Sequence, residues 1–401
     1  MTEISLAHQR PQGRAAPSPP PEGGKQAWGG GPALAYQPVE VSPPGATLRD
    51  LLEERDWTQR ELAHRLGRPP QAVNEILAGK KEITEDTALE LERVTQVPAQ
   101  FWLVRESHYR EYLARVRSTV AARENLPWLE QFPLKALQDA GVLPAGRLTQ
   151  AFKQALVEPL LRFFGVASPA GWKAHYEQMQ PQFRRARPAR QADVAAITAW
   201  LRMGELHATR LQTADYIPAR LQAALPAMRA LTTQPPERIQ RELVRLCADA
   251  GVALVFVPAL PGAQVSGVAR WLHGKPLIQL SLLGKWNDGF WFSFFHEVGH
   301  VLKHPARAIF LDDAAAGATA DMPEEEEANR FAADTLVPRA QQARLAALPL
   351  EAASIEAFAR DIGVHPGIVV GQLQHRGRLG YGHVLTRLKA RYDITPRTAQ
   401  H

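Results

Sequence analysis

The stretch Asn287-Asp288-Gly289-Phe290-Trp291-Phe292-Ser293-Phe294-Phe295-His296-Glu297-Val298-Gly299-His300 decides the fold of the C-terminal part of the chain. Its aromatic residues predict a helix buried on several sides, with Asn287-Asp288 as the N-cap. Histidines four residues apart project from one helix face, so His296 and His300 can reach the same metal ion. The carboxylate of Glu297 can take a proton from a water molecule and pass it to a leaving amine. The stretch therefore predicts a metal-dependent hydrolytic site.

A second segment, residues 324–329, supports this prediction. It follows the histidine pair after a gap that leaves room for a loop and a return helix, which can deliver a third ligand. Glu325 and Asn329 are four apart and share a helix face, so Glu325 can bind the metal while Asn329 holds either the imidazole of His296 or the helix that carries it. Three protein ligands leave one position open for water, as catalytic zinc requires. We expect Zn²⁺, with Mn²⁺ able to substitute in vitro.

Simpler interpretations of both segments stay open at this point. A core helix can carry two histidines by chance, and a run of glutamates can be a solvated first turn placed favourably against the helix dipole. Glu326 and Glu327 flank the expected ligand and are alternatives to it. The sequence pattern therefore leaves Glu325, Glu326 and Glu327 as alternatives for the third ligand.

Residues 59–77 carry a different pattern, in which apolar side chains recur at the spacing of two short helices. Leu62, Leu66, Val73 and Ile76 form the inward faces of these helices. A glycine between them allows a left-handed turn, and two prolines can open the second helix, where a missing amide proton costs little. The pattern predicts a helix-turn-helix.

Exposed polar residues of this unit predict contacts with double-stranded DNA. Gln71 and Asn74 lie near the start of the second helix, where side chains reach base edges. Gln59 opens the first helix, and Lys80 and Lys81 follow the second as phosphate clamps would. Nearby acidic residues offset this charge, so a helical protein-interaction unit is the alternative.

Composition bounds the organisation of the chain. Its 401 residues leave room for two or three domains. Of these residues 45% are hydrophobic and 22% are charged, which are ordinary proportions for a globular protein. We expect a disordered tail (1–42), a five-helix DNA-binding domain (43–105), a helical linker region (106–235) and a zincin-like metallopeptidase domain (236–395). Strands near 252–257, 267–272 and 276–282 make the fold class mostly α with a small β-sheet, that is α+β.

Other global features point to the compartment. No apolar run approaches the roughly 20 residues of a membrane-spanning helix, and no secretory signal core is present. The single cysteine, Cys247, cannot form an intramolecular disulfide. The net charge of +6 permits a polyanionic partner without requiring one. We expect a cytoplasmic protein without a membrane partner.

The N-terminal unit resembles the HigA-type antitoxins of the XRE family. The resemblance rests on residues 57–80, 83–92 and 98–103, and it covers about 44–115. It implies binding to an operator, usually as a homodimer, and a HigB-like ribonuclease toxin as a further partner.

The C-terminal part is similar to the ImmA/IrrE family of metallopeptidases. The similarity rests on residues 267–271, 278–281, 288–300, 327–333 and 365–373. It implies cleavage of an XRE-type repressor protein, which derepresses stress or mobile-element genes, and it implies Glu325 as the third metal ligand. It also implies that residues 278–281 form an edge strand of the sheet, along which an extended substrate lies. By the same resemblance, His365 is a further candidate site residue.

Two functions from different classes follow. The first is a DNA-binding transcriptional regulator with a zinc-dependent endopeptidase domain. The alternative is a non-catalytic HigA-like antitoxin or repressor, in which the zincin-like domain senses a ligand or is structural. Intact His296, Glu297 and His300 favour the enzyme, because a degenerate sensor has no need of the base.

Overall fold

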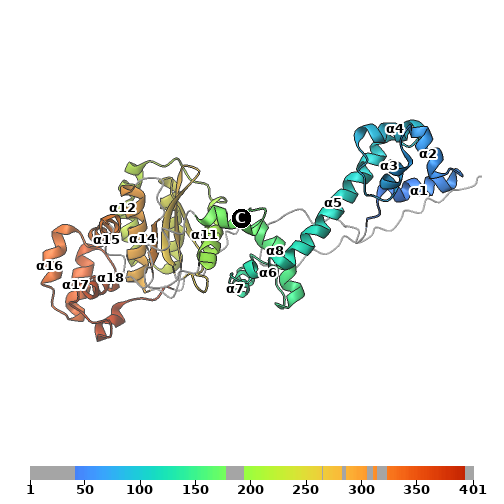
Figure 1. Ribbon diagram of the computed structural model, residues 1–401. Coiled ribbons are helices and arrows are strands. Elements are labelled where there is room, and N and C mark those ends of the chain that lie inside the picture. Colours follow the sequence, from blue (N-terminus) through green and yellow to red (C-terminus); the bar gives the residue numbers. More distant parts are fainter. Residues whose placement is uncertain are drawn as a thin grey trace, which may run out of the picture.

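The computed structural model describes residues 41–177, 194–263, 265–281, 286–304, 310–313 and 323–392. Residues 1–40 of the tail expected at 1–42 lie outside the described residues. The described part is mostly helical and contains one four-stranded sheet, so the expected α+β class is confirmed. Figure 1 shows a helical N-terminal unit joined by the long helix α5 to a layered unit around the sheet.

Five helices form the N-terminal unit: α1 (Pro44–Glu54), α2 (Gln59–Leu66), α3 (Pro70–Leu77), α4 (Glu85–Thr95) and α5 (Ala99–Glu124). Leu62, Val73 and Ile76 are buried in its core together with Trp102, and Leu66 packs against it partly buried. The apolar pattern of the sequence therefore forms the expected contact between α2 and α3.

Local signals begin and end these helices. Thr58 caps α2 by accepting a hydrogen bond from the backbone N–H of Glu61 at 3.1 Å. Gly67 ends α2 with φ of 62°, the left-handed conformation that favours glycine, and Pro70 is the first residue of α3. α5 is longer than the short helix expected here, since it runs for 26 residues. The expected domain boundary at 105 thus lies inside a continuous helix.

The middle of the chain is helical: α6 (Leu126–Leu129), α7 (Leu134–Asp139), α8 (Gln150–Phe164), α9 (Pro169–Glu177), α11 (Val194–Ala208), α12 (Pro218–Ala230), the 3-10 turn η1 (Leu231–Thr233) and α13 (Pro236–Asp249). α5 contacts α6 and α8 at its far end. The helices from α6 to α11 share a hydrophobic core with one face of the sheet. The region expected as a linker therefore supplies one layer of the C-terminal unit.

Four strands make the sheet in the order β1-β3-β2-β4: β1 (Ala253–Phe256), β2 (Val265–Leu272), β3 (Lys275–Leu280) and β4 (Phe310–Asp313). β1 is parallel to β3, whereas β2 is antiparallel to both β3 and β4. Successive side chains of a strand point to opposite faces. In β1, Leu254 and Phe256 join the core on the side of α14, and Ala253 and Val255 join the core on the side of α11.

The position of β3 corrects one expectation. Ile278 pairs with Leu254 on one side and with Ala269 on the other, so β3 is a central strand. The prediction that 278–281 is an edge strand open to an extended substrate is therefore wrong. Both of its edges already form backbone hydrogen bonds, and only β1 and β4 lie at the borders of the described sheet.

The second face of the sheet is covered by α12 and α13 and by the C-terminal helices, which are α14 (Asn287–Lys303), α15 (Pro323–Leu336), α16 (Gln342–Ala346), α17 (Ala352–Ile362) and α18 (Pro366–His375), with the 3-10 turns η2 (Arg339–Gln341) and η3 (Val384–Leu388). α14 begins at Asn287, and its N-cap is Trp286. The expectation that Asn287-Asp288 forms the N-cap is therefore wrong. The side chain of Asn287 accepts a hydrogen bond from the backbone N–H of Ala390 at 3.2 Å and so holds the C-terminal segment. Among the described helices, none has the length and apolar character needed to cross a bilayer.

A buried ion pair ties α11 to the sheet. Arg270 on β2 is 2% exposed, and its guanidinium lies 2.6 Å from a carboxylate oxygen of Glu205. It also donates to the carbonyl of Leu201 at 2.5 Å, and Arg202 binds the second oxygen of Glu205 at 2.7 Å. Because a buried charge is costly without partners, this network fixes how the helix lies on the strand.

We expect Gly204→Ala to destabilise this layer. A Cβ at Gly204 would lie 1.8 Å from Oε1 of Gln279, a fully buried side chain that donates to the carbonyl of Trp200 at 2.7 Å. Relieving the clash must disturb that hydrogen bond, so the free energy of unfolding should fall by about 1–3 kcal/mol. Urea unfolding measures the change.

Gly171→Ala is the matched control, because Gly171 is also helical and its Cβ would meet its nearest neighbour at an ordinary 3.6 Å. This variant should be unchanged or more stable by up to about 1 kcal/mol. Equal stability of the two variants would contradict the proposed close approach of α11 to β3.

Candidate metal centre

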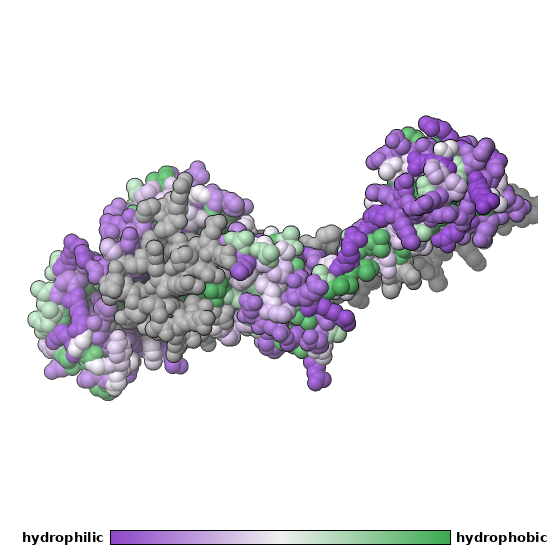
Figure 2. Space-filling view, in the orientation of Figure 1, coloured by the Kyte–Doolittle hydropathy of each residue, from purple (hydrophilic) through white to green (hydrophobic). Residues whose placement is uncertain are grey.

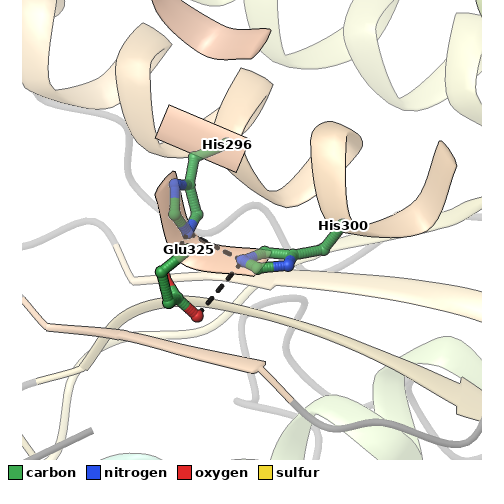
Figure 3. Close-up of side chains that lie close together, drawn as sticks. All are labelled: His296, His300 and Glu325. Carbon is green, nitrogen blue, oxygen red and sulfur yellow. Dashed lines mark hydrogen bonds and ion pairs between the residues drawn. The ribbon is translucent and has the colours of Figure 1, made fainter. Parts of the chain in front are cut away.

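Two histidines and one glutamate meet between α14 and α15 (Figure 3). Nε2 of His296 and Nε2 of His300 are 2.9 Å apart, and they lie 3.2 and 3.4 Å from the carboxylate oxygens of Glu325. All three residues are buried, with exposures of 2%, 2% and 7%. The structure therefore brings together the three residues that the sequence predicted as metal ligands.

The electrostatics of this cluster suit metal binding. Burial lowers the pKa of His300 to about 4, so its imidazole is neutral at pH 7. Burial alone would raise the pKa of Glu325, but hydrogen bonds with His296 and His300 outweigh it and lower the pKa to about 2. A neutral imidazole and an ionised carboxylate are the forms that coordinate a cation.

The separations also fit the size of a metal ion. In a tetrahedral site, bonds of about 2.0–2.1 Å to nitrogen and oxygen place neighbouring ligand atoms about 3.3 Å apart. The distances of 2.9, 3.2 and 3.4 Å within the cluster are close to this value. Two imidazoles and one carboxylate therefore fit one small divalent cation and leave a further position for water or substrate.

Asn329 lies where the sequence placed it. Its Oδ1 is 3.0 Å from Nδ1 of His296, and an amide oxygen can only accept a hydrogen bond. Nδ1 of His296 must therefore carry the proton, which leaves the lone pair of Nε2 directed at the cluster. Asn329 thus fixes both the orientation and the tautomer of His296.

A close crossing of α14 and α15 makes this geometry possible. A Cβ at Gly299 would lie 3.2 Å from the Cα of Ala328 and 3.1 Å from the ring of Phe331, tighter than most such contacts. Glycine on one helix and alanine on the other let the two backbones approach. Glu325, one turn before Ala328, then reaches the histidines of α14.

Glu297 is fully buried next to the cluster on α14. On the side of the sheet it faces Gly267 of β2, where a Cβ would stand 2.6 Å from Oε1 of Glu297. Gly267 follows a register shift between β2 and β4, where the strand departs from regular pairing. The absence of a side chain at Gly267 therefore makes the space that the carboxylate occupies.

The other glutamates of the acidic turn lie elsewhere. Glu326 is exposed. Glu327 is half exposed, and its carboxylate lies 3.5 Å from Nε2 of His304 and 3.9 Å from Nζ of Lys303. Of the three candidates for the third ligand, the structure brings Glu325 to the histidine pair.

Sequence reasoning missed His304. Its Nδ1 lies 2.8 Å from Nδ1 of His300, and its side chain is 4% exposed. The signal was present in the sequence, because His296, His300 and His304 recur every four residues along one face of α14.

His365, a candidate by resemblance, lies at the other end of α14. It is the N-cap of α18, and its Nδ1 accepts from the backbone N–H of Gly367 at 3.0 Å. The same nitrogen lies 2.7 Å from Nδ2 of Asn287, and burial lowers the pKa of the imidazole. His365 therefore joins α18 to the start of α14, and the structure does not bring it to the metal ligands.

The residues predicted to bind DNA lie on the surface of the N-terminal unit. Gln59 is the first residue of α2, Gln71 and Asn74 lie on α3, and Lys80 and Lys81 follow α3. All five are exposed. The face of this unit seen in Figure 2 is largely hydrophilic. Contact of these five residues with bases and phosphates stays a prediction.

Comparison with known families agrees with this division of the chain. The family model described as helix-turn-helix matches residues 48–102, and the model described as IrrE N-terminal-like domain matches residues 259–373. No curated protein and no solved structure matches the chain. The chain thus contains an XRE-type helix-turn-helix domain and an IrrE/ImmA-like peptidase domain.

The two matches support a DNA-binding regulator that carries a protease-like domain. The peptidase family and the buried cluster together suggest a metal ion. The match over residues 48–102 does not distinguish HigA-type proteins from other helix-turn-helix proteins, so the HigA-type resemblance stays a prediction.

We expect about one divalent metal per chain, lost in His296→Ala, His300→Ala and Glu325→Ala because each removes a donor atom. Asn329→Ala should keep the site but weaken affinity about 10–100-fold. Elemental analysis after dialysis against a weak chelator measures both effects.

The control is Glu326→Ala, which removes a neighbouring exposed carboxylate and should keep the full metal content. Full metal in Glu325→Ala together with loss in Glu326→Ala would show that another glutamate is the ligand.

Proposed function

We propose that this protein is a transcriptional regulator with a zinc-dependent endopeptidase domain that cleaves a repressor of the XRE type. The observation that carries the proposal is the buried set of His296, His300 and Glu325 with Glu297 beside it, in the domain that matches the peptidase family. A merely structural cluster would need no further buried carboxylate at Glu297, the residue that follows His296 in the chain.

The residues of the chain have distinct roles in this proposal. His296, His300 and Glu325 hold Zn²⁺, which when bound polarises the scissile carbonyl and acidifies water. Glu297 takes the proton of the attacking water and delivers it to the leaving amine. Burial of Glu297 against Gly267 keeps its carboxylate in one place, so it is positioned before the substrate arrives.

The helix-turn-helix domain supports a regulatory role for the cleavage. The XRE-type repressor proposed as substrate is a DNA-binding protein, so the helix-turn-helix domain of this chain would bring the peptidase domain to the same DNA as its substrate. Gln71 and Asn74 read bases in this proposal, while Gln59, Lys80 and Lys81 hold the backbone. Two copies of the chain binding two half-sites would supply the symmetry that such operators have.

Glu297→Gln should reduce cleavage by about 10²–10⁴-fold, because it removes the proton acceptor while keeping the size of the side chain. Metal content and operator affinity should stay unchanged, since Glu297 is not a ligand in this scheme. Mass spectrometry of candidate repressors incubated with the zinc-loaded full-length protein measures the rate.

Cleavage by Glu297→Gln at the wild-type rate would refute the peptidase assignment. Normal metal content and operator binding without cleavage of repressors by the wild type would favour the alternative, a non-catalytic repressor with a sensory zincin-like domain.

Asn74→Ala should relax sequence preference at one or two base pairs by about 1–3 kcal/mol, because a base contact is lost. Lys80→Ala should instead weaken binding to all duplexes and make the salt dependence shallower. Fluorescence anisotropy with selected and scrambled duplexes at several salt concentrations separates the two effects.

Gln131→Ala is the control, since Gln131 is exposed and lies outside the helix-turn-helix domain. Salt-independent binding, or no binding by the wild type to any selected duplex, would favour the interaction-module alternative.

A further inference from the structure

The metal-binding face of α14 does not end at His300. His304 lies one further turn along, and the Nδ1 atoms of the two rings are 2.8 Å apart. Both side chains are almost completely buried. Two imidazole nitrogens this close require one proton between them, so one ring must donate and the other accept.

The direction of this hydrogen bond follows from the rest of the cluster. Nε2 of His300 faces Nε2 of His296 and the carboxylate of Glu325, where a lone pair is needed to bind a cation. Nδ1 of His300 therefore carries the proton and donates, and Nδ1 of His304 accepts.

The second nitrogen of the acceptor ring lies near a carboxylate. With Nδ1 of His304 accepting, the proton of that ring lies on Nε2, which faces the carboxylate of Glu327 at 3.5 Å. Lys303 lies 3.9 Å from the other oxygen of Glu327. A carboxylate cannot donate when ionised, so Glu327 selects the tautomer of His304.

We propose that His304, oriented by Glu327, is a positioning residue that sets the tautomer and orientation of His300 as a metal ligand. The inference rests on the metal site of the proposed function. The two ligand histidines are then held by different means: an amide oxygen for His296 and a second imidazole for His300. One turn of α15 therefore supplies the ligand Glu325, the residue Asn329 that holds His296, and the residue Glu327 that faces His304.

The test compares two substitutions of nearly equal size. His304→Leu removes the acceptor, and we expect it to weaken Zn²⁺ affinity about 10–100-fold. His304→Asn keeps an acceptor oxygen near the position of Nδ1, and we expect its affinity to stay within about 3-fold of wild type. Competition of the full-length protein with a chromophoric zinc chelator measures affinity without using peptidase activity.

Glu327→Gln gives an independent variant on the other helix. The amide can donate as well as accept, so it no longer selects one tautomer of His304, and affinity should fall by a smaller factor than in His304→Leu. Glu326→Gln is the matched control and should bind Zn²⁺ as wild type does. The thermal midpoint of each metal-free protein separates a positioning effect, which leaves it unchanged, from a general loss of structure.

Wild-type affinity in His304→Leu, or equal losses in His304→Leu and His304→Asn, would overturn the role of His304 while leaving the metal site intact. Should His304→Leu not fold, equal affinity of Glu327→Gln and Glu326→Gln would overturn it instead. Failure of the wild-type protein to bind Zn²⁺ at all would refute the proposed function itself, which is a separate outcome.

Discussion

The close crossing of α14 and α15 at Gly299 and Ala328 is the contact on which the rest of the site depends. At this crossing a Cβ on Gly299 would lie only 3.2 Å from the Cα of Ala328. A larger side chain at either position would move α15 away, and a carboxylate reaches only a few ångström from its backbone. The metal cluster is therefore specified as much by two residues without functional groups as by the three that carry them.

The parts of this protein that could be predicted from sequence are those set by helical periodicity. His296 and His300 share a face because they are four residues apart, and the same spacing relates Glu325 to Asn329. In the N-terminal unit, the glycine between two amphipathic segments marked the turn, and Gly67 adopts the left-handed conformation there. Local rules suffice where the contacts are local.

The parts that could not be predicted depend on contacts between distant segments. The central place of β3 follows from its pairing with both β1 and β2, and nothing within 275–280 distinguishes a central strand from an edge strand. The covering of the sheet by the helices from α6 to α11 likewise depends on a shared core that unites residues over a hundred positions apart. His304 was visible in the periodicity, but its role needed the position of Glu327 on another helix.

The ion pair between Arg270 and Glu205 determines which part of the chain must stay together when its gene recombines with another. Arg270 lies within the segment that matches the peptidase family, whereas Glu205 lies more than fifty residues before that segment begins. A gene fusion that carried only the matched segment would leave a guanidinium in the protein interior without its carboxylate, at a penalty of about 3–5 kcal/mol. Recombination that preserves a folded peptidase-like domain must therefore transfer α11 with the sheet, although the candidate metal ligands all lie downstream of it.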